Sequence, residues 1–179
     1  LTNGILKLIH IDPTQKSNTI TESELKVYVD VSHKEGQIET EERKMIYNIF
    51  AFSDICARDI MIPRLNMVTI SSTDSCKELL AIYKESLYTR IPVYQEDKDD
   101  MLGFINIKDF FIARENAPGD KEFPLQPLIR EAYYTYEYKK SADLLFEMRE
   151  KSMHIAFVLN EYGSTVGMIT LEDLLEELV

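Results

Sequence analysis

The sequence predicts a mixed α/β (α+β) fold in which a β-α-β-β-α unit occurs twice after a helical N-terminal segment. From residue 58 onward, short apolar runs and amphipathic stretches follow one another in the same order twice. Three matching positions share a spacing of 64 residues: Ile91 and Ile155, Gly103 and Gly167, Asp109 and Asp173. Because one unit of about 60 residues buries little surface alone, the two halves are expected to share a core and to leave two clefts between them.

Residues 1–55 are expected to form a linker and two helices. Thr21 and Glu24 have the spacing of a capping box, in which each side chain bonds the other residue's backbone N–H. Gly36 is expected to end the first helix, and the second begins near Glu39, since acidic residues favour a helix N-terminus. The apolar face of the second helix is expected to pack against the body of the domain, with a partner-binding helix as the alternative. This face consists of Met45, Ile46, Ile49 and Phe50.

The periodicity of apolar residues places the elements of each half. In the first half, residues 56–119, strands are expected at 68–70, 91–94 and 102–107, and helices at 74–86 and from Lys108. In the second half, residues 120–179, strands are expected at 134–136, 154–159 and 166–170, and helices at 141–151 and from Leu171. The stretch 115–127 predicts a connecting loop because it contains Pro118, Gly119, Pro124 and Pro127. The acidic run 96–100 predicts a solvated hairpin turn rather than a calcium loop.

Composition limits the function classes that the chain can serve. With 31 acidic and 20 basic residues the formal net charge is −11, which argues against binding to nucleic-acid phosphates or to anionic lipid. Cys56 and Cys76 lack metal-type spacing and are expected to be reduced thiols, as in the cytosol. No apolar run reaches the roughly 18 to 20 residues that a membrane span requires. Because the chain starts without Met, we expect it to be an excised piece of a longer protein.

Thr170 and Asp173 stand where a strand of the second half runs into a helix, and two interpretations apply. In the first they form a capping box. In the second, the helix N-terminus and the Thr170 hydroxyl bind a phosphate, the Asp173 carboxylate accepts from ribose hydroxyls, and Gly167 lets a flat base approach the backbone. Asn106 and Asp109 occupy the equivalent places in the first half. We therefore expect a second cleft beside Thr170 and a weaker first cleft beside Asn106.

The strand and turn of each half resemble the CBS repeat. That family's pattern is a strand Arg-h-Pro-Val, where h is hydrophobic, followed by a turn Gly-h-h-x-x-x-Asp. The first copy has Arg-Ile-Pro-Val at 90–93, and the resemblance extends over residues 58–179. The second copy has His-Ile-Ala-Phe at 154–157, which removes one arginine from the second cleft. The resemblance implies tandem CBS repeats that form a Bateman-type module.

Other segments are similar to the CorC/HlyC/CNNM family, the hemolysin-like magnesium and cobalt transport proteins. They are Glu-Gly-Gln-Ile-Glu-Thr-Glu-Glu-Arg at 35–43, Met-Ile-Pro-Arg at 61–64, Asn-Glu-Tyr-Gly-Ser-Thr at 160–165 and the closing Thr-Leu-Glu-Asp-Leu-Leu-Glu-Glu-Leu at 170–178. In that family a membrane domain precedes the CBS pair, so residues 1–13 resemble the tail that leaves it. The resemblance implies the cytoplasmic portion of an inner or plasma membrane protein, joined to a transmembrane domain.

The resemblance also implies a regulatory ligand, an adenine nucleotide, which is ATP with Mg²⁺ or AMP. The residues implied for the second cleft are Thr170, Asp173, Gly167, Ile155, Ile62, Pro63 and Arg64. Those implied for the weaker first cleft are Asn106, Asp109, Arg90, Ile91 and Arg130. Because a domain of charge −11 offers few basic groups, Mg²⁺ is expected to arrive with ATP and bridge its phosphate oxygens, without a metal site made by the protein.

A second hypothesis is a structural dimerisation module of the same membrane protein, with clefts that are empty or filled by side chains. Asn106, Ile62 and His154 favour this alternative, because each departs from the family pattern. Under both hypotheses two modules are expected to pair through their helices as a homodimer. No enzyme is expected, because the sequence supports no pair of nucleophile and base and the CBS scaffold is regulatory.

Overall fold

The structure is a computed structural model that describes residues 20–117 and 122–179. The expectations for residues 1–13 and for Pro118 and Gly119 lie outside the described residues. The chain divides into two compact units, Leu1–Tyr47 and Asn48–Val179. The second unit contains all strands of the described residues, and the two clefts therefore belong to it.

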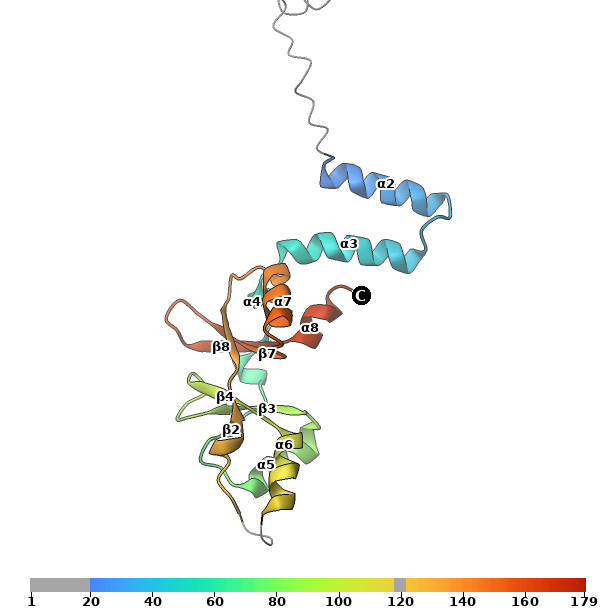
Figure 1. Cartoon of the computed structure of the whole chain (residues 1–179). Coiled ribbons are helices and arrows are strands. Elements are labelled where there is room, and N and C mark those ends of the chain that lie inside the picture. The colour runs from blue at the N-terminus through green and yellow to red at the C-terminus, as the bar shows by residue number, and fades with distance from the viewer. Residues whose placement is uncertain (1–19, 118–121) are drawn as a thin grey trace, which may run out of the picture. The chain divides into compact units, whose positions relative to one another are not determined.

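The elements follow the order that the sequence predicts (Figure 1). The α-helices are α2 (Glu22–Lys34), α3 (Thr40–Asp54), α4 (Ala57–Ile60), α5 (Cys76–Ser86), α6 (Ile107–Asn116), α7 (Ser141–Glu150) and α8 (Leu171–Glu176). The strands are β1 (Ile62–Pro63), β2 (Ile70–Ser71), β3 (Arg90–Tyr94), β4 (Met101–Asn106), β5 (Ile129–Arg130), β6 (Tyr133–Tyr136), β7 (Ile155–Leu159) and β8 (Thr165–Thr170). Each repeat thus has the expected β-α-β-β-α order, and β1 and β5 are additional short strands.

The helical N-terminal segment begins and turns as its sequence indicates. The Glu24 N–H donates to Thr21 Oγ1 over 3.3 Å, and the Thr21 N–H donates to the Glu24 carboxylate over 2.7 Å, which confirms the capping box. Gly36 follows α2 with a φ of 73°, a left-handed conformation that favours glycine. Within the first unit, Arg43 of α3 donates to Asp30 of α2 over 2.7 Å.

The prediction that the apolar face of α3 packs on the domain is wrong for two of its residues. Met45 is 42% exposed and Ile49 is 53% exposed, whereas Phe52 is only 5% exposed. These three residues lie on one stripe of the helix, at spacings of four and three residues. Only the last turn of α3 therefore reaches the core, where Phe52 packs with Leu144 and Met148 of α7.

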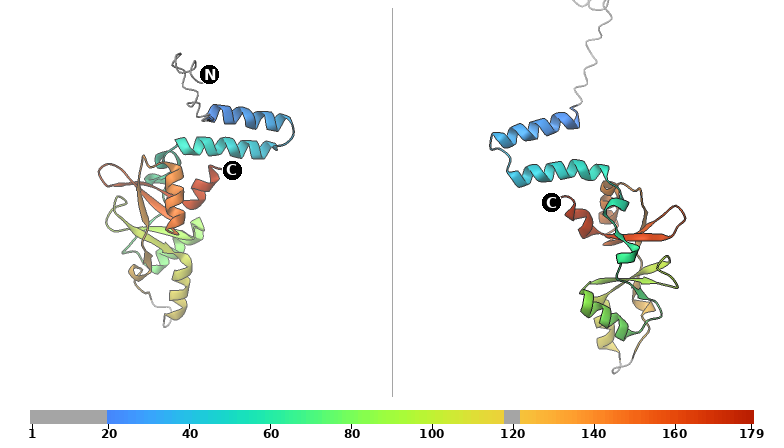
Figure 2. Two further views of the ribbon diagram at one scale, coloured as in Figure 1. Left: turned by 45° about the horizontal axis from the view of Figure 1, so that its top comes forward. Right: turned by 180° about the vertical axis from the view of Figure 1, so that it is seen from behind.

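Two four-stranded sheets form the second unit, and each borrows a strand (Figures 1 and 2). Their strand orders are β1-β8-β7-β6 and β2-β3-β4-β5. β1 precedes the first repeat, yet it pairs with β8 of the second, with Ile62 opposite Met168. β5 lies between the repeats and pairs with β4 of the first, with Arg130 opposite Phe104. This exchange ties each repeat to the other.

The register of the hairpins corrects one of the three repeat anchors. Val93 pairs with Gly103 in the first hairpin, and Val158 pairs with Gly167 in the second. The glycines are 64 residues apart but the valines are 65 apart, because the connection 95–100 is one residue longer than 160–164. Ile155 is therefore the counterpart of Arg90, and the spacing between Ile91 and Ile155 does not mark equivalent positions.

The repeats share a core, as expected. A cluster of buried side chains is contributed by both sheets and by the segments that join them: Met67, Met101, Phe104, Ala132, Ile155, Phe157 and Met168. Helices α5 and α6 pack on the sheet of the first repeat, and α7 and α8 pack on that of the second (Figure 1). Cys76 is buried and Cys56 half-buried, both as free thiols. Among the described residues, no helix combines the length and the apolar character needed to cross a membrane.

Candidate functional site

The second cleft is built around the junction of β8 and α8. The Thr170 N–H donates to Asp173 Oδ2 over 2.8 Å, and the Asp173 N–H donates to Thr170 Oγ1 over 3.2 Å. The capping interpretation is therefore correct for these two residues. It does not exhaust their chemistry, because the Thr170 hydroxyl keeps its own proton to donate and the carboxylate of Asp173 keeps a second oxygen to accept.

Gly167 has a structural role that differs from the expected one. A Cβ atom at Gly167 would lie 2.6 Å from the Ile62 carbonyl oxygen, so the group that approaches this glycine closely is the backbone of β1. Gly103 is equivalent, because a Cβ there would collide with the Arg130 carbonyl oxygen of β5. Both glycines thus admit the exchanged strands, and the expectation that Gly167 exposes backbone to a flat base is wrong.

Three other residues implied for the second cleft lie beside β8. Ile62 and Pro63 of β1 pair with Met168 and Gly167, and Ile155 of β7 pairs with Thr170. The structure therefore brings these segments together with the Thr170 turn. The side chain of Ile155, however, is 1% exposed in the shared core, so its contribution to a cleft wall comes from its backbone.

Arg64 does not face Thr170. Its guanidinium forms an ion pair with Asp99 on the β3–β4 hairpin, and the Asp99 carbonyl accepts from the Thr165 N–H over 3.2 Å. Thr165 and Thr170 are the two ends of β8, roughly 16 Å apart at the rise of a strand. The expectation that Arg64 serves the same ligand as Thr170 is therefore wrong for this conformation, because Asp99 holds it at the other end of the strand.

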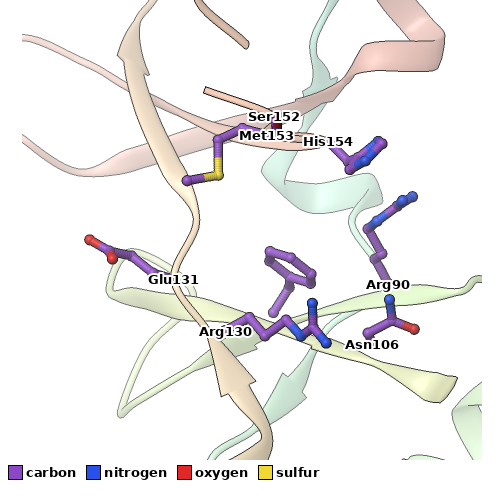
Figure 3. Close-up of a pocket in the computed structure, with 8 residues that line it drawn as sticks. Arg90, Asn106, Arg130, Glu131, Ser152, Met153 and His154 are labelled. Carbon is purple, nitrogen blue, oxygen red and sulfur yellow. The ribbon is translucent and has the colours of Figure 1, made fainter. Parts of the chain in front are cut away.

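The first cleft is a cavity of about 270 Å³ between the repeats (Figure 3). Its walls come from both repeats, and the lining residues are Arg90, Phe104, Asn106, Arg130, Glu131, Ser152, Met153 and His154. Arg90, Asn106 and Arg130 were expected there. Ile91 was also expected but is fully buried in the core of the first repeat.

Ser152, Met153 and His154 are residues of the first cleft that sequence reasoning missed. They belong to the second repeat, in the connection between α7 and β7, and meet the first repeat across the cavity (Figure 3). The one-residue difference in hairpin length hid them, because it aligned His154 with Arg90. In the structure the His154 carbonyl accepts from the Leu171 N–H, as the Thr89 carbonyl accepts from the Ile107 N–H. His154 is therefore the counterpart of Thr89.

Asp109 is already bonded within the first cleft region. Arg130 donates to it through Nε over 2.6 Å and through Nη2 over 2.8 Å, a bidentate pair. Asn106 Oδ1 accepts from the Lys108 N–H over 3.0 Å and so caps α6. Asp109 thus fixes Arg130, and the expectation that it holds a ribose in this cleft does not agree with this conformation.

Comparison with known proteins now identifies the family. The model of the CBS domain matches residues 57–116 and 136–179. A solved CBS domain of the bacterial CNNM/CorC family Mg²⁺ transporter has a TM-score of 0.81 and 32% sequence identity, covering 89% of this chain and 96% of that one. The chain is a CBS pair of the CNNM/CorC family. The same family's CBS domain in complex with ATP has a TM-score of 0.70 and 33% identity, covering 77% of this chain and 96% of that one.

Relatives of this CBS pair are considerably longer proteins. The UPF0053 protein YrkA of Bacillus subtilis is 40% identical over 161 residues, which are 89% of this chain and 37% of YrkA. The magnesium and cobalt efflux protein CorC of Vibrio cholerae is 38% identical over 144 residues, 79% of this chain and 48% of CorC. The CBS pair thus spans less than half of either relative. It belongs to a family of transporter domains and not to a catalytic family.

Proposed function

We propose that this CBS pair is the cytoplasmic regulatory module of a CorC-type magnesium or cobalt transport protein and that it binds an adenine nucleotide, with Mg²⁺-ATP preferred over AMP. The observation that carries the proposal is the Thr170–Asp173 arrangement at the start of α8. A hydroxyl donor and a carboxylate acceptor stand together there, as a phosphate and a ribose require. Support also comes from the ATP complex of a CBS domain that is 33% identical to this one.

The scarcity of cations favours ATP that is accompanied by Mg²⁺. Arg64 is engaged by Asp99, and Asp173 adds negative charge beside the Thr170 hydroxyl. Among residues 20–117 and 122–179, no group of three or more His, Cys, Asp and Glu is placed to hold a metal ion. The ion would therefore enter with the nucleotide, bridging phosphate oxygens and keeping several waters, as Mg²⁺ prefers.

Isothermal titration calorimetry tests this proposal. Wild-type chain is titrated with ATP in the presence and absence of Mg²⁺, and with AMP. We expect saturable binding of Mg²⁺-ATP in the micromolar to millimolar range, roughly −8 to −4 kcal/mol. The Thr170→Val variant should lose this binding, whereas Thr73→Val, at an exposed threonine before α5, should not. Unchanged affinity in Thr170→Val rejects the site.

A structural dimerisation module is the second candidate. Its support is that Thr170 and Asp173 satisfy each other, that Asp109 is paired with Arg130, and that β1 fills the space at Gly167. Several large apolar side chains on the helices of the two repeats are exposed, namely Phe111, Ile112, Phe146 and Leu175. A folded, nucleotide-free chain that gives no heat with any nucleotide but sediments as a dimer would favour this candidate. We expect a dimer in both cases.

A further inference from the structure

Arg90 belongs to the wall of the first cleft and also touches the helix of the second. Its side chain lines the 270 Å³ cavity and points toward the His154 side of it (Figure 3). Its Nη1 atom lies 3.7 Å from Oε1 of Glu172. Glu172 is the second residue of α8, between Thr170, which caps that helix, and Asp173. One guanidinium therefore stands between the two clefts.

Arg90 is the more available of the two arginines in the first cleft. Arg130 is fixed by two short hydrogen bonds to Asp109, of 2.6 and 2.8 Å. Arg90 has a single, longer contact of 3.7 Å with a carboxylate whose side chain is mostly exposed. Because an exposed single ion pair of this kind is weak, a phosphate group can replace Glu172 as its partner.

The link between the clefts exists in one direction only. By the register of the hairpins, the counterpart of Arg90 is Ile155, and the counterpart of Glu172 is Lys108, 64 residues earlier. An isoleucine and a lysine cannot form the equivalent ion pair. The asymmetry means that the fold does not require this contact, and that it is a feature of these two side chains.

We infer that Arg90 is a cation shared by the two clefts, so that phosphate-bearing ligands in the first cleft and beside α8 compete for it. A phosphate in the first cleft draws Arg90 from Glu172 and leaves that carboxylate unneutralised beside the Thr170 turn. A phosphate beside α8 draws Arg90 the other way. Binding to the two clefts is then negatively coupled, and the coupling is reciprocal. This inference rests on the proposed nucleotide binding at Thr170.

Methionine methyl groups allow each cleft to be observed separately. Met153 lines the first cleft, and Met61 packs against Gly167 beside β8. The chain, labelled with [methyl-¹³C]methionine, is titrated with Mg²⁺-ATP, and the midpoint of each methyl shift is measured by NMR. The second cleft of wild type should fill first, since Asn106 replaces the threonine in the first. In Thr170→Val, whose second cleft stays empty, the Met153 midpoint should fall by about two- to fivefold.

Further variants remove the shared cation or its partner. In an Arg90→Gln background, Thr170→Val should no longer change the Met153 midpoint. Glu172→Gln should lower that midpoint about two- to fivefold, because Arg90 is released to the first cleft. Glu176→Gln makes the same charge change on the same helix, without the contact to Arg90, and should leave the midpoint unchanged.

The outcomes separate this inference from the proposed function. If Met61 shifts in a Thr170-dependent way but Met153 never moves, nucleotide binding stands and the shared role of Arg90 is wrong. The same conclusion follows if Glu172→Gln and Glu176→Gln have equal effects, or if Thr170→Val raises the Met153 midpoint or leaves it unchanged. If neither methyl moves at millimolar Mg²⁺-ATP, both proposals fail. Thermal unfolding of each variant shows that it is folded.

Discussion

The carbonyl oxygen of Ile62 lies 2.6 Å from the place where a Cβ atom on Gly167 would stand. Glycine at 167 is thus the condition for the pairing of β1 with β8, through which residues before the first repeat join the sheet of the second. The same relation between Gly103 and Arg130 joins β5 to β4. The two glycines of the repeat pattern therefore serve the connection between repeats.

The first prediction is that Gly167→Ala destabilises the second unit by about 1 to 3 kcal/mol, because the backbone of β1 must move to admit a methyl group. The free energy of unfolding in urea measures this effect. Gly163→Asn is the control, because Gly163 has a φ of 82° that asparagine tolerates, and a Cβ atom there would meet nothing within 4 Å. This control should cost less than about 1 kcal/mol. Equal stability of Gly167→Ala and wild type would contradict the role assigned to the glycine.

Most of the secondary structure could be predicted from the sequence, because it is encoded locally. The capping pair Thr21–Glu24 and the strand-to-helix junction at Thr170 are visible in the spacing of side chains. The exchange of β1 and β5 could not be predicted in the same way. These strands have two residues each, too few for a periodicity, and their partners lie about 100 and 25 residues away along the chain.

The candidate site could be predicted only in part, because its side-chain partners depend on register. The position of Asn106, Arg90 and Arg130 at one cavity was correct. The pairing of Arg64 with Asp99 was missed, since it joins a linker to a hairpin tip. A difference of one residue between the connections 95–100 and 160–164 was enough to misplace Ile155 relative to the first repeat.

A second prediction separates the capping role of Thr170 from its proposed binding role. Thr170→Val removes the cap of α8 and should lower the free energy of unfolding by about 0.5 to 2 kcal/mol while abolishing Mg²⁺-ATP binding. Ser75 forms an equivalent capping box with Glu78 at the start of α5. Ser75→Ala should lose a similar stability and keep the binding, and Thr170→Ser should keep both. Urea unfolding and calorimetry on the same samples distinguish these cases; loss of binding in Ser75→Ala would show that stability alone accounts for the effect.

A third prediction concerns Arg64, which Asp99 holds away from Thr170. Arg64→Gln should leave the affinity for Mg²⁺-ATP within about twofold of wild type, since a charge roughly 16 Å away is largely screened at physiological salt. Calorimetry at about 0.15 M salt measures the affinity, and Asp99→Asn serves as the matched variant of the same pair. A tenfold loss in Arg64→Gln alone would show that the arginine leaves Asp99 and reaches the nucleotide.

The last prediction concerns pH and rests on Glu147 of α7. Lys139 Nζ and the Tyr133 hydroxyl each donate to its carboxylate over 2.6 Å, and these bonds lower the pKa of Glu147 from its ordinary value of 4.5. A lowered pKa in the folded state gives stability that is present above pH 4.5 and is lost as the pH falls through the folded value. The hydrogen bond to Glu147 also raises the pKa of Tyr133 from 10.0 to about 12, so stability from this group is present below pH 10 and lost between pH 10 and 12.

Glu147→Gln should therefore be less stable than wild type at pH 7, and the difference should shrink below pH 4.5 and above pH 10. Urea unfolding from pH 3 to 11 measures the difference, and ultraviolet titration should show one tyrosine whose pKa moves back toward 10 in the variant. Glu150→Gln, at an exposed position of the same helix, controls for the change in net charge. A stability difference that stays constant across this range would mean that the two hydrogen bonds of Glu147 do not contribute to folding.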